Sequence, residues 1–159
     1  MTLPPFQKLV DAHWAEVARL CHALSWADEA DDAAQRAWLL ALRAYPKIRH
    51  GANLRGWLLT IAARVATEQH RERARRPTPL ADAPDPSLRR DDTVADDGVL
   101  WQRVRALPAR QRTAVALHYI LRLPHKEVAA VLGTTSAATR RLVSDALVAL
   151  RKDPQLKEC

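Results

Sequence analysis

The sequence is short of the residues that build disulfide frameworks, membrane spans and tight glycine-rich loops. Its 159 residues include only 2 cysteines, 4 glycines and 1 phenylalanine. Cys21 and Cys159 are too few for a disulfide framework, and Cys21 falls on the apolar side of a predicted helix, which favours a core thiol. No apolar window is long enough for a membrane-spanning helix, and the N-terminus lacks the basic and apolar runs of a signal peptide. We therefore expect a cytoplasmic protein without membrane insertion.

Groups that carry out catalysis or bind metals are also missing at usable spacing. The sequence has no paired carboxylates, no nucleophile beside a base and no glycine-rich phosphate loop. His13 shares a predicted helix with Cys21 and His22, but these lie more than two turns further along, so the three side chains do not converge on a metal. We expect no enzyme activity, no cofactor and no metal site.

Helix-forming alanine, leucine and arginine are abundant, and they predict an all-α fold. No alternating run of β-branched and aromatic residues is long enough for a strand. The net charge of +7 divides into +4 on residues 1–76, −4 on residues 77–98 and +7 on residues 99–159. Two basic segments joined by an acidic one favour binding to a polyanion such as nucleic acid. Arginine-rich helical proteins can also simply be well solvated.

The first half of the chain is predicted to form a domain of three helices. The first helix covers residues 6–24, where apolar side chains recur at helical spacing. The second begins at the acidic cluster 28–32, which suits a helix N-terminus, and ends at Pro46. Asn53 can cap the third helix, which loses its apolar stripe and ends in the basic run 71–76. This domain spans residues 1–76.

Residues 77–98 are predicted to be a flexible linker. Four prolines block helix formation there, and aspartates crowd the remaining positions. Residues 99–159 are predicted to form a second helical domain, with one short helix that stops near Pro108 and another over residues 109–121. The chain has no internal repeat.

Residues 123–152 are predicted to form a helix-turn-helix. Gly133 stands where the first helix must stop, and Thr135 or Ser136 can cap the second. The second helix is basic on its outer side, as reading of the DNA major groove requires. An ordinary helical hairpin uses the same caps and periodicity, so both interpretations stay open. The residues predicted to face inward on the second helix are Thr139, Val143, Ala146 and Leu150.

Five short motifs follow one another along the chain, at residues 30–35, 38–43, 53–62, 107–112 and 127–133. In these motifs and in their order, the chain resembles the extracytoplasmic-function (ECF) sigma factors of bacterial RNA polymerase. The resemblance implies two helical domains joined by a flexible linker, binding to the β′ clamp and β flap of core polymerase, and recognition and melting of promoter DNA. Members of this family are commonly held inactive by an anti-sigma protein, which is a further implied partner.

The resemblance also implies three sets of contact residues, with Trp38 and Leu42 holding the clamp-binding helix on its core. The aspartates of that helix can equally cap it, and Trp57 can equally belong to the core. The implied polymerase contacts are Asp31, Asp32, Gln35, Trp38 and Arg43. The implied contacts to the −10 promoter element are Ile48, His50, Asn53, Arg55, Trp57, Arg71, Arg73, Arg75 and Arg76. The implied contacts to the −35 element are Lys126, Thr135, Ser136, Arg140, Arg141 and Ser144.

The chain departs from the family pattern in both predicted domains. Arg36 stands where an acidic residue usually follows the glutamine, which can weaken or re-tune polymerase docking. In the predicted recognition helix, Asp145 repels phosphate, and Leu142 and Leu147 replace polar residues. Two hypotheses stay open for these leucines. In the first they are exposed in the free lobe, which means either weak −35 binding or a partner protein that covers them. In the second they pack on neighbouring helices of a slightly rotated lobe.

The sequence therefore predicts a sigma factor that directs core polymerase to promoters and helps to melt the −10 region. The alternative is a helix-turn-helix regulator that binds duplex DNA without polymerase. That alternative leaves the helices of the first domain without a purpose. A small nucleic-acid-processing enzyme is disfavoured by the lack of a catalytic cluster.

Overall fold

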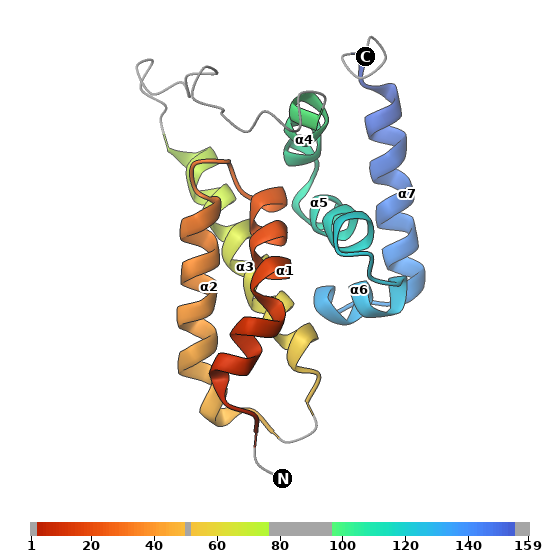
Figure 1. Cartoon of the computed structure of the whole chain (residues 1–159). Helices are drawn as coiled ribbons and strands as arrows, with labels where there is room; N and C mark the ends of the chain where they lie inside the picture. Colours follow the sequence, from red (N-terminus) through yellow and green to blue (C-terminus); the bar gives the residue numbers. More distant parts are fainter. Residues whose placement is uncertain (1–2, 50–51, 77–96, 155–159) are drawn as a thin grey trace.

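The computed structural model describes residues 3–49, 52–76 and 97–154, and every regular element in these ranges is helical, which confirms the predicted all-α fold (Figure 1). No helix of the described residues is both long and apolar enough to cross a membrane. The predicted linker lies almost entirely outside the described residues. The elements are α1 (Phe6–Leu24), α2 (Ala30–Ala44), η1 (Tyr45–Lys47), α3 (Leu54–Arg75), α4 (Asp97–Ala106), α5 (Ala109–Val115), the π-helix η3 (Ala116–Ile120), α6 (His125–Leu132) and α7 (Ser136–Lys152).

Helices α1, α2 and α3 pack side by side and form the N-terminal lobe (Figure 1). Leu20 and Leu58 are fully buried between them, and α2 adds small alanines that let the helix axes approach closely. Cys21 is also buried, as predicted, and this burial raises the pKa of its thiol to about 12. The thiol is therefore a protonated core group and not a reactive one.

Aromatic side chains close the end of the N-terminal lobe where α2 finishes. Phe6 packs edge-on against Trp38 at 6.0 Å and against Tyr45 at 5.2 Å between ring centroids. The Tyr45 hydroxyl donates a hydrogen bond to the carbonyl of Pro4. Trp38 is buried, as predicted, but Leu42 is 50% exposed, so the prediction that it holds α2 on the core is wrong.

Helices α4 to α7, with η3, form the C-terminal lobe, and its helix-turn-helix is built as the sequence predicts. Gly133 has φ +67° at the end of α6, a left-handed conformation that glycine adopts without penalty. The Thr135 side chain caps α7 by accepting a hydrogen bond from the Ala138 amide at 3.1 Å. Thr139 and Val143 are buried on the inner face of α7.

The two unusual leucines of α7 are packed and not exposed. Leu142 and Leu147 are partly buried against the hydrophobic core. The exposed large hydrophobic residue of α7 is Val148, at 42%. The hypothesis that these leucines form a free apolar surface is therefore wrong, and the alternative, packing on neighbouring helices, is confirmed.

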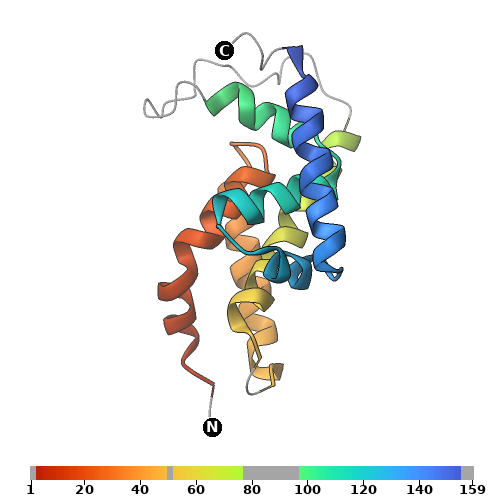
Figure 2. The ribbon, with the colours of Figure 1, turned by 90° about the vertical axis from the view of Figure 1, so that its right-hand side faces the viewer.

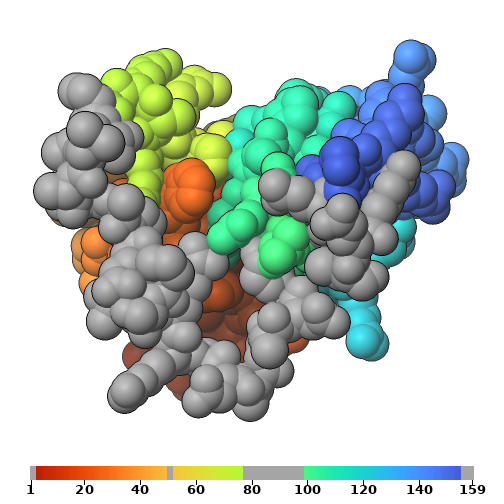
Figure 3. Space-filling view, turned by 90° about the horizontal axis from the view of Figure 1, so that it is seen from above, coloured from red at the N-terminus to blue at the C-terminus, as the bar shows by residue number. Residues whose placement is uncertain are grey.

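The two lobes pack against each other, which the sequence did not predict. Seen from the side and from above, the C-terminal lobe lies against α1 and α3 (Figures 2 and 3). One cluster of buried apolar residues runs through both lobes, from Leu20 and Leu58 to Leu117 and Val128. An apolar core that continues across a junction favours its closure, because separating the lobes would return that surface to water.

Arginines of the C-terminal lobe bind the end of α1. The Arg105 guanidinium donates to the His22 carbonyl at 3.1 Å, and the Arg112 guanidinium donates to the Leu24 carbonyl at 3.5 Å. Both arginines are buried. The last carbonyls of a helix lack partners within the helix and carry partial negative charge, so cationic donors suit this position.

Replacing the glycine at the turn tests the helix-turn-helix geometry. We expect Gly133→Ala to lower the free energy of unfolding by about 1 kcal/mol, because an L side chain is strained at positive φ. Nothing lies within 4 Å of the added Cβ, so the cost is one of backbone conformation alone. Gly133→Asn is the matched control, since asparagine tolerates this conformation, and we expect a smaller loss. Urea unfolding measures both, and an equal loss in the two variants would contradict the interpretation.

Candidate nucleic-acid interface

The outer face of α2 combines charged, polar and apolar side chains. Of the residues implied as contacts there, Asp31, Asp32, Gln35 and Arg43 are exposed. Trp38 is only 8% exposed and packs in the core, so it supports the face from behind and does not contribute to its surface.

Two exposed leucines on the same face of α2 were not predicted from the sequence as contact residues. Leu39 is 56% exposed and Leu42 is 50% exposed. They follow Gln35 at steps of four and three residues, which places the three on one side of the helix. Arg36, the departure from the family pattern, is also exposed on this helix. Exposed leucines flanked by polar residues are typical of a protein-binding surface. The helical spacing could have revealed them, had Leu42 not been assigned to the core.

The start of α3 and the segment before it hold some of the residues implied to contact the −10 element. The Asn53 side chain accepts a hydrogen bond from the Gly56 amide at 3.0 Å, which confirms the predicted cap. Ile48 and Trp57 are half-buried against the core, and Trp57 lies 6.4 Å from the Tyr45 ring. This packing favours the core role for Trp57. His50 lies outside the described residues.

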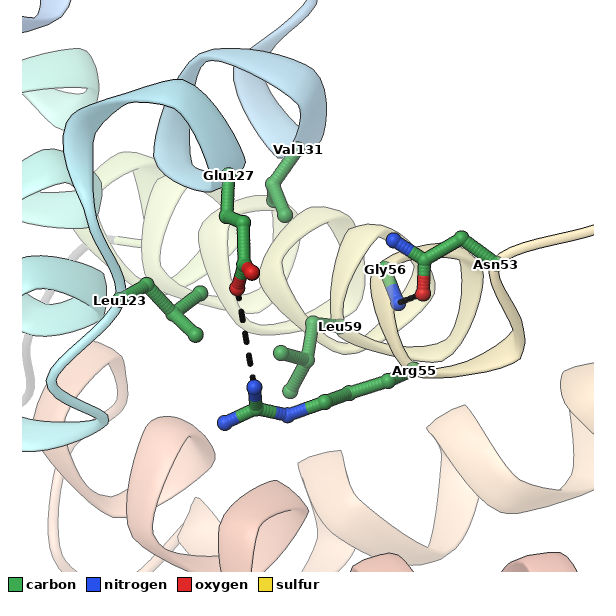
Figure 4. A pocket seen from close by; sticks show the side chains of 7 residues that line it. All are labelled: Asn53, Arg55, Gly56, Leu59, Leu123, Glu127 and Val131. Carbon is green, nitrogen blue, oxygen red and sulfur yellow. Dashed lines mark hydrogen bonds and ion pairs between the residues drawn. The ribbon is translucent and has the colours of Figure 1, made fainter.

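Arg55 is bound to carboxylates of both lobes. Its Nε lies 2.9 Å from the Glu16 carboxylate on α1, and its Nη1 lies 3.6 Å from the Glu127 carboxylate on α6. The hydrogen bond that Arg55 donates to the Glu16 carboxylate raises the pKa of Arg55 above its ordinary value. Beside this arginine, a small pocket of about 60 Å³ lies between α3 and α6 (Figure 4). Its lining is Asn53, Arg55, Gly56, Leu59, Leu123, Glu127 and Val131.

Of the arginines at the basic end of α3, one is paired within the fold and the others are exposed and available to bind phosphates. Arg73 lies 2.6 Å from the Asp28 carboxylate and 4.9 Å from the centre of the Trp26 ring, so it is committed to the fold. Arg71 is 56% exposed, at 3.8 Å from Glu68. Arg75 and Arg76 are exposed. Exposed arginines can neutralise phosphates with little reorganisation, whereas Arg73 would first have to leave its carboxylate.

The outer side of the helix-turn-helix gathers the other implied DNA contacts. The Arg141 side chain is 85% exposed, and its weak pairing with Asp145 at 3.9 Å leaves it available. Thr135 is exposed but already serves as the cap of α7. Ser136 is half-buried at the start of α7. The further implied contacts that are exposed are Lys126, Arg140 and Ser144. An exposed basic helix behind a capped turn is the arrangement that enters a major groove.

Among the described residues, no group of three histidines, cysteines, aspartates or glutamates could hold a metal ion. His118 and His125 stack at 4.2 Å beside Tyr119. The pKa of His125 is lowered by burial and by the neighbouring charges of His118 and Arg140.

His70 is stacked on Trp26 at the junction of the lobes, at 5.7 Å between ring centroids. Burial, followed by the positive charges of Arg112, Arg105 and Arg73, lowers its pKa to about 4. The folded state therefore favours the neutral imidazole, while the unfolded chain protonates near 6.5. Stability from this group is complete above pH 6.5 and is lost as the pH falls toward 4.

The variant His70→Gln tests the contribution of His70 to the pH dependence of stability, because glutamine does not titrate. We expect the loss of unfolding free energy between pH 7 and pH 4.5 to be smaller in the variant than in the wild type. Urea unfolding at several pH values gives the comparison. Parallel pH profiles for the two proteins would contradict the assignment.

Comparison with known families matches both lobes, in order. Residues 9–76 match the family described as Sigma-70 region 2, and residues 98–150 match the family described as Sigma-70, region 4. The two matches together include most of the described helices.

Named relatives agree with these matches. The chain is 34% identical over 143 residues to the ECF RNA polymerase sigma factor SigJ of Mycobacterium tuberculosis, covering 80% of this chain but only 44% of SigJ. It is 29% identical over 157 residues to the ECF RNA polymerase sigma factor SigC of the same species, covering 94% of this chain and 83% of SigC. The chain thus spans less than half of the first relative and most of the second.

The fold is shared with a solved complex. The sigma factor RpoE of Bartonella quintana, crystallised with the anti-sigma factor NepR, superposes with a TM-score of 0.71 at 22% sequence identity. The superposition covers 92% of this chain and 94% of that chain. At this identity the likeness shows a shared fold.

Proposed function

The chain belongs to the ECF group of the sigma-70 family, and we propose that it acts as a transcription initiation factor that binds core RNA polymerase and directs it to specific promoters. The observation that carries this proposal is the presence of regions 2 and 4, in order, on one chain. A regulator that used only its helix-turn-helix would not account for the match over residues 9–76. Catalysis belongs to the polymerase in this proposal.

Core polymerase docks, in our proposal, on the outer face of α2. The support is an exposed face that combines Asp32, Gln35 and Arg43 with Leu39 and Leu42. The leucines would supply apolar contact area, and the polar residues would set the orientation. The β′ clamp is the element of the polymerase that the family resemblance assigns to this helix, and the β flap is assigned to the C-terminal lobe.

Promoter DNA contacts both lobes in this proposal. Asn53, Arg55 and the exposed arginines at the end of α3 would bind the melted −10 strand, with the basic run on its phosphates. Helix α7 would enter the major groove of the −35 element with Arg140 and Arg141. The chain would divide into residues 1–76, 77–98 and 99–159 for these tasks.

An anti-sigma protein is a further proposed partner. The support is that the structurally similar RpoE was crystallised with one.

Transcription from purified components tests the proposed function directly. Core polymerase with this chain should start transcripts at defined promoters, and sequencing their 5′ ends would identify the sites. Duplex binding without any start sites would favour the regulator that acts without polymerase.

Removing the two exposed leucines of α2 tests the docking face. We expect Leu39→Ala/Leu42→Ala to weaken binding to core polymerase by about 10-fold or more, since exposed apolar anchors dominate interfaces. Stability should change little, because both side chains are half exposed. Leu40→Ala is the matched control, because this leucine is 42% exposed on the same helix but lies on another side of it, and the variant should keep wild-type affinity. Measured affinity for core enzyme that is equal in all three proteins would contradict the assignment.

Neutralising the arginines of α7 tests the −35 contacts. We expect Arg140→Ala/Arg141→Ala to weaken duplex binding and to lower the salt dependence by about one unit of slope for each phosphate that the variant no longer binds. A base contact would also relax the sequence preference at one position. Arg19→Ala on α1 is a control with one exposed arginine removed from the other lobe. Fluorescence anisotropy over a range of salt concentrations measures these effects, and an unchanged slope in the α7 variant would argue against phosphate contact.

A further inference from the structure

Two histidine rings stack on each other where the helix-turn-helix begins. His118 on η3 and His125, the first residue of α6, lie 4.2 Å apart between ring centroids, with their planes 13° apart. The Nδ1 atom of His118 donates a hydrogen bond to the Leu123 carbonyl at 2.9 Å, since a carbonyl can only accept. Tyr119 packs edge-on against His118 at 4.9 Å. The stack therefore connects the first turn of α6 to the π-helix that precedes it.

The surroundings of His125 disfavour a positive charge on its ring. Burial lowers its pKa most, followed by the positive charges of His118 and Arg140. Its Nδ1 atom is buried with no hydrogen-bond partner among the described residues, and the residue stands at the positive end of the α6 dipole. The nearest acidic residue along α6, Glu127, is already paired with Arg55 at 3.6 Å. In the free chain the neutral form of His125 is therefore favoured.

Cations that are proposed to contact the −35 element surround the same ring. Lys126 follows His125 on α6, Arg140 acts on it from α7, and both cationic side chains are exposed. A duplex phosphate bound by these two cations would neutralise the charge that repels a proton from His125. The same phosphate would attract an imidazolium, because an imidazole in a negative field holds its proton to a higher pH. Binding of DNA would thus reverse the electrostatic preference of this histidine.

We propose that His125 belongs to the −35 contact surface and takes up one proton from solvent when the chain binds duplex DNA, so that the affinity rises as the pH falls. The proposal rests on the −35 assignment made above for Lys126 and Arg140. The imidazole becomes an imidazolium, and no other bond in the chain forms or breaks. Since the buried Nδ1 has no acceptor where it lies, the charged ring turns out of the stack, where both nitrogens can donate hydrogen bonds. By reciprocity, bound DNA stabilises the proton and the proton stabilises bound DNA.

Duplex binding at two pH values tests the proton uptake. The probe is a fluorescein-labelled duplex that carries the −35 region of a promoter mapped by the transcript sequencing described above. Its anisotropy is measured with the full chain at pH 8 and pH 6, at constant ionic strength. We expect the wild type to bind ~3- to 5-fold more tightly at pH 6, a gain that one linked proton can supply. The variant His125→Gln should lose most of this gain.

Two further variants serve as controls. His125→Phe keeps an aromatic ring against His118 but does not titrate, so it should fold normally and lose the gain as His125→Gln does. His22→Gln removes an exposed imidazole from the N-terminal lobe, and we expect it to keep the pH dependence of the wild type.

Nuclear magnetic resonance of the imidazole protons follows the titration of His125 directly, with its signals assigned by their loss in His125→Phe. We expect the midpoint of this titration to lie higher in the duplex complex than in the free chain. In the free chain, Arg140→Gln should raise the midpoint, because it removes a neighbouring positive charge. This last measurement needs no DNA.

The outcomes separate the possible failures. An equal midpoint in the free and bound chain, or an undiminished gain in both His125 variants, would overturn the proton uptake and leave the −35 assignment intact. A gain that is lost equally in His22→Gln would overturn the assignment to His125. An unchanged midpoint in Arg140→Gln would overturn the coupling to α7. A wild-type chain that binds no duplex at either pH would overturn the −35 assignment itself, and the proposal with it.

Discussion

The buried end of α1 is the contact on which the arrangement of the molecule depends. Its last carbonyl groups have no partners within the helix, and Arg105 and Arg112 of the C-terminal lobe supply the donors. The negative end of the helix dipole favours these cations. Since the apolar core continues across the same junction, the C-terminal lobe is held against α1 and α3 and not merely tethered to them.

This packing decides which surfaces are available. The outer faces of α2 and α7 remain exposed, so the proposed polymerase and −35 contacts need no rearrangement. The start of α3 lies under α6, and Arg55 is shared between carboxylates of both lobes. The proposed binding surfaces on α2 and α7 are thus exposed in the free chain. The third, at the start of α3, takes part in the contact between the lobes.

Much of the fold follows from local sequence signals, while errors appear where packing between helices decides. The cap at Asn53 and the turn at Gly133 were predicted correctly, and Thr135 was one of two predicted caps, because caps and turns depend on a few neighbouring residues. Leu42 was predicted to hold α2 on the core but is exposed, whereas for Leu142 the sequence left exposure and packing open and the structure shows it partly buried. Helical periodicity gives a direction around the helix axis, but the width and angle of the buried stripe depend on which helices pack against it.

The sequence by itself determined the helices, their ends and the family, because each of these is encoded in residues close together along the chain. Only the tertiary structure decided which arginines are free of carboxylate partners and exposed for binding to DNA. Arg73 is paired with Asp28, and Arg55 with Glu16 and Glu127, whereas Arg75 and Arg76 are exposed. In the sequence these four arginines look equivalent. Their partners lie on other helices, and an ion pair forms only where the packing of those helices brings opposite charges within a few ångströms.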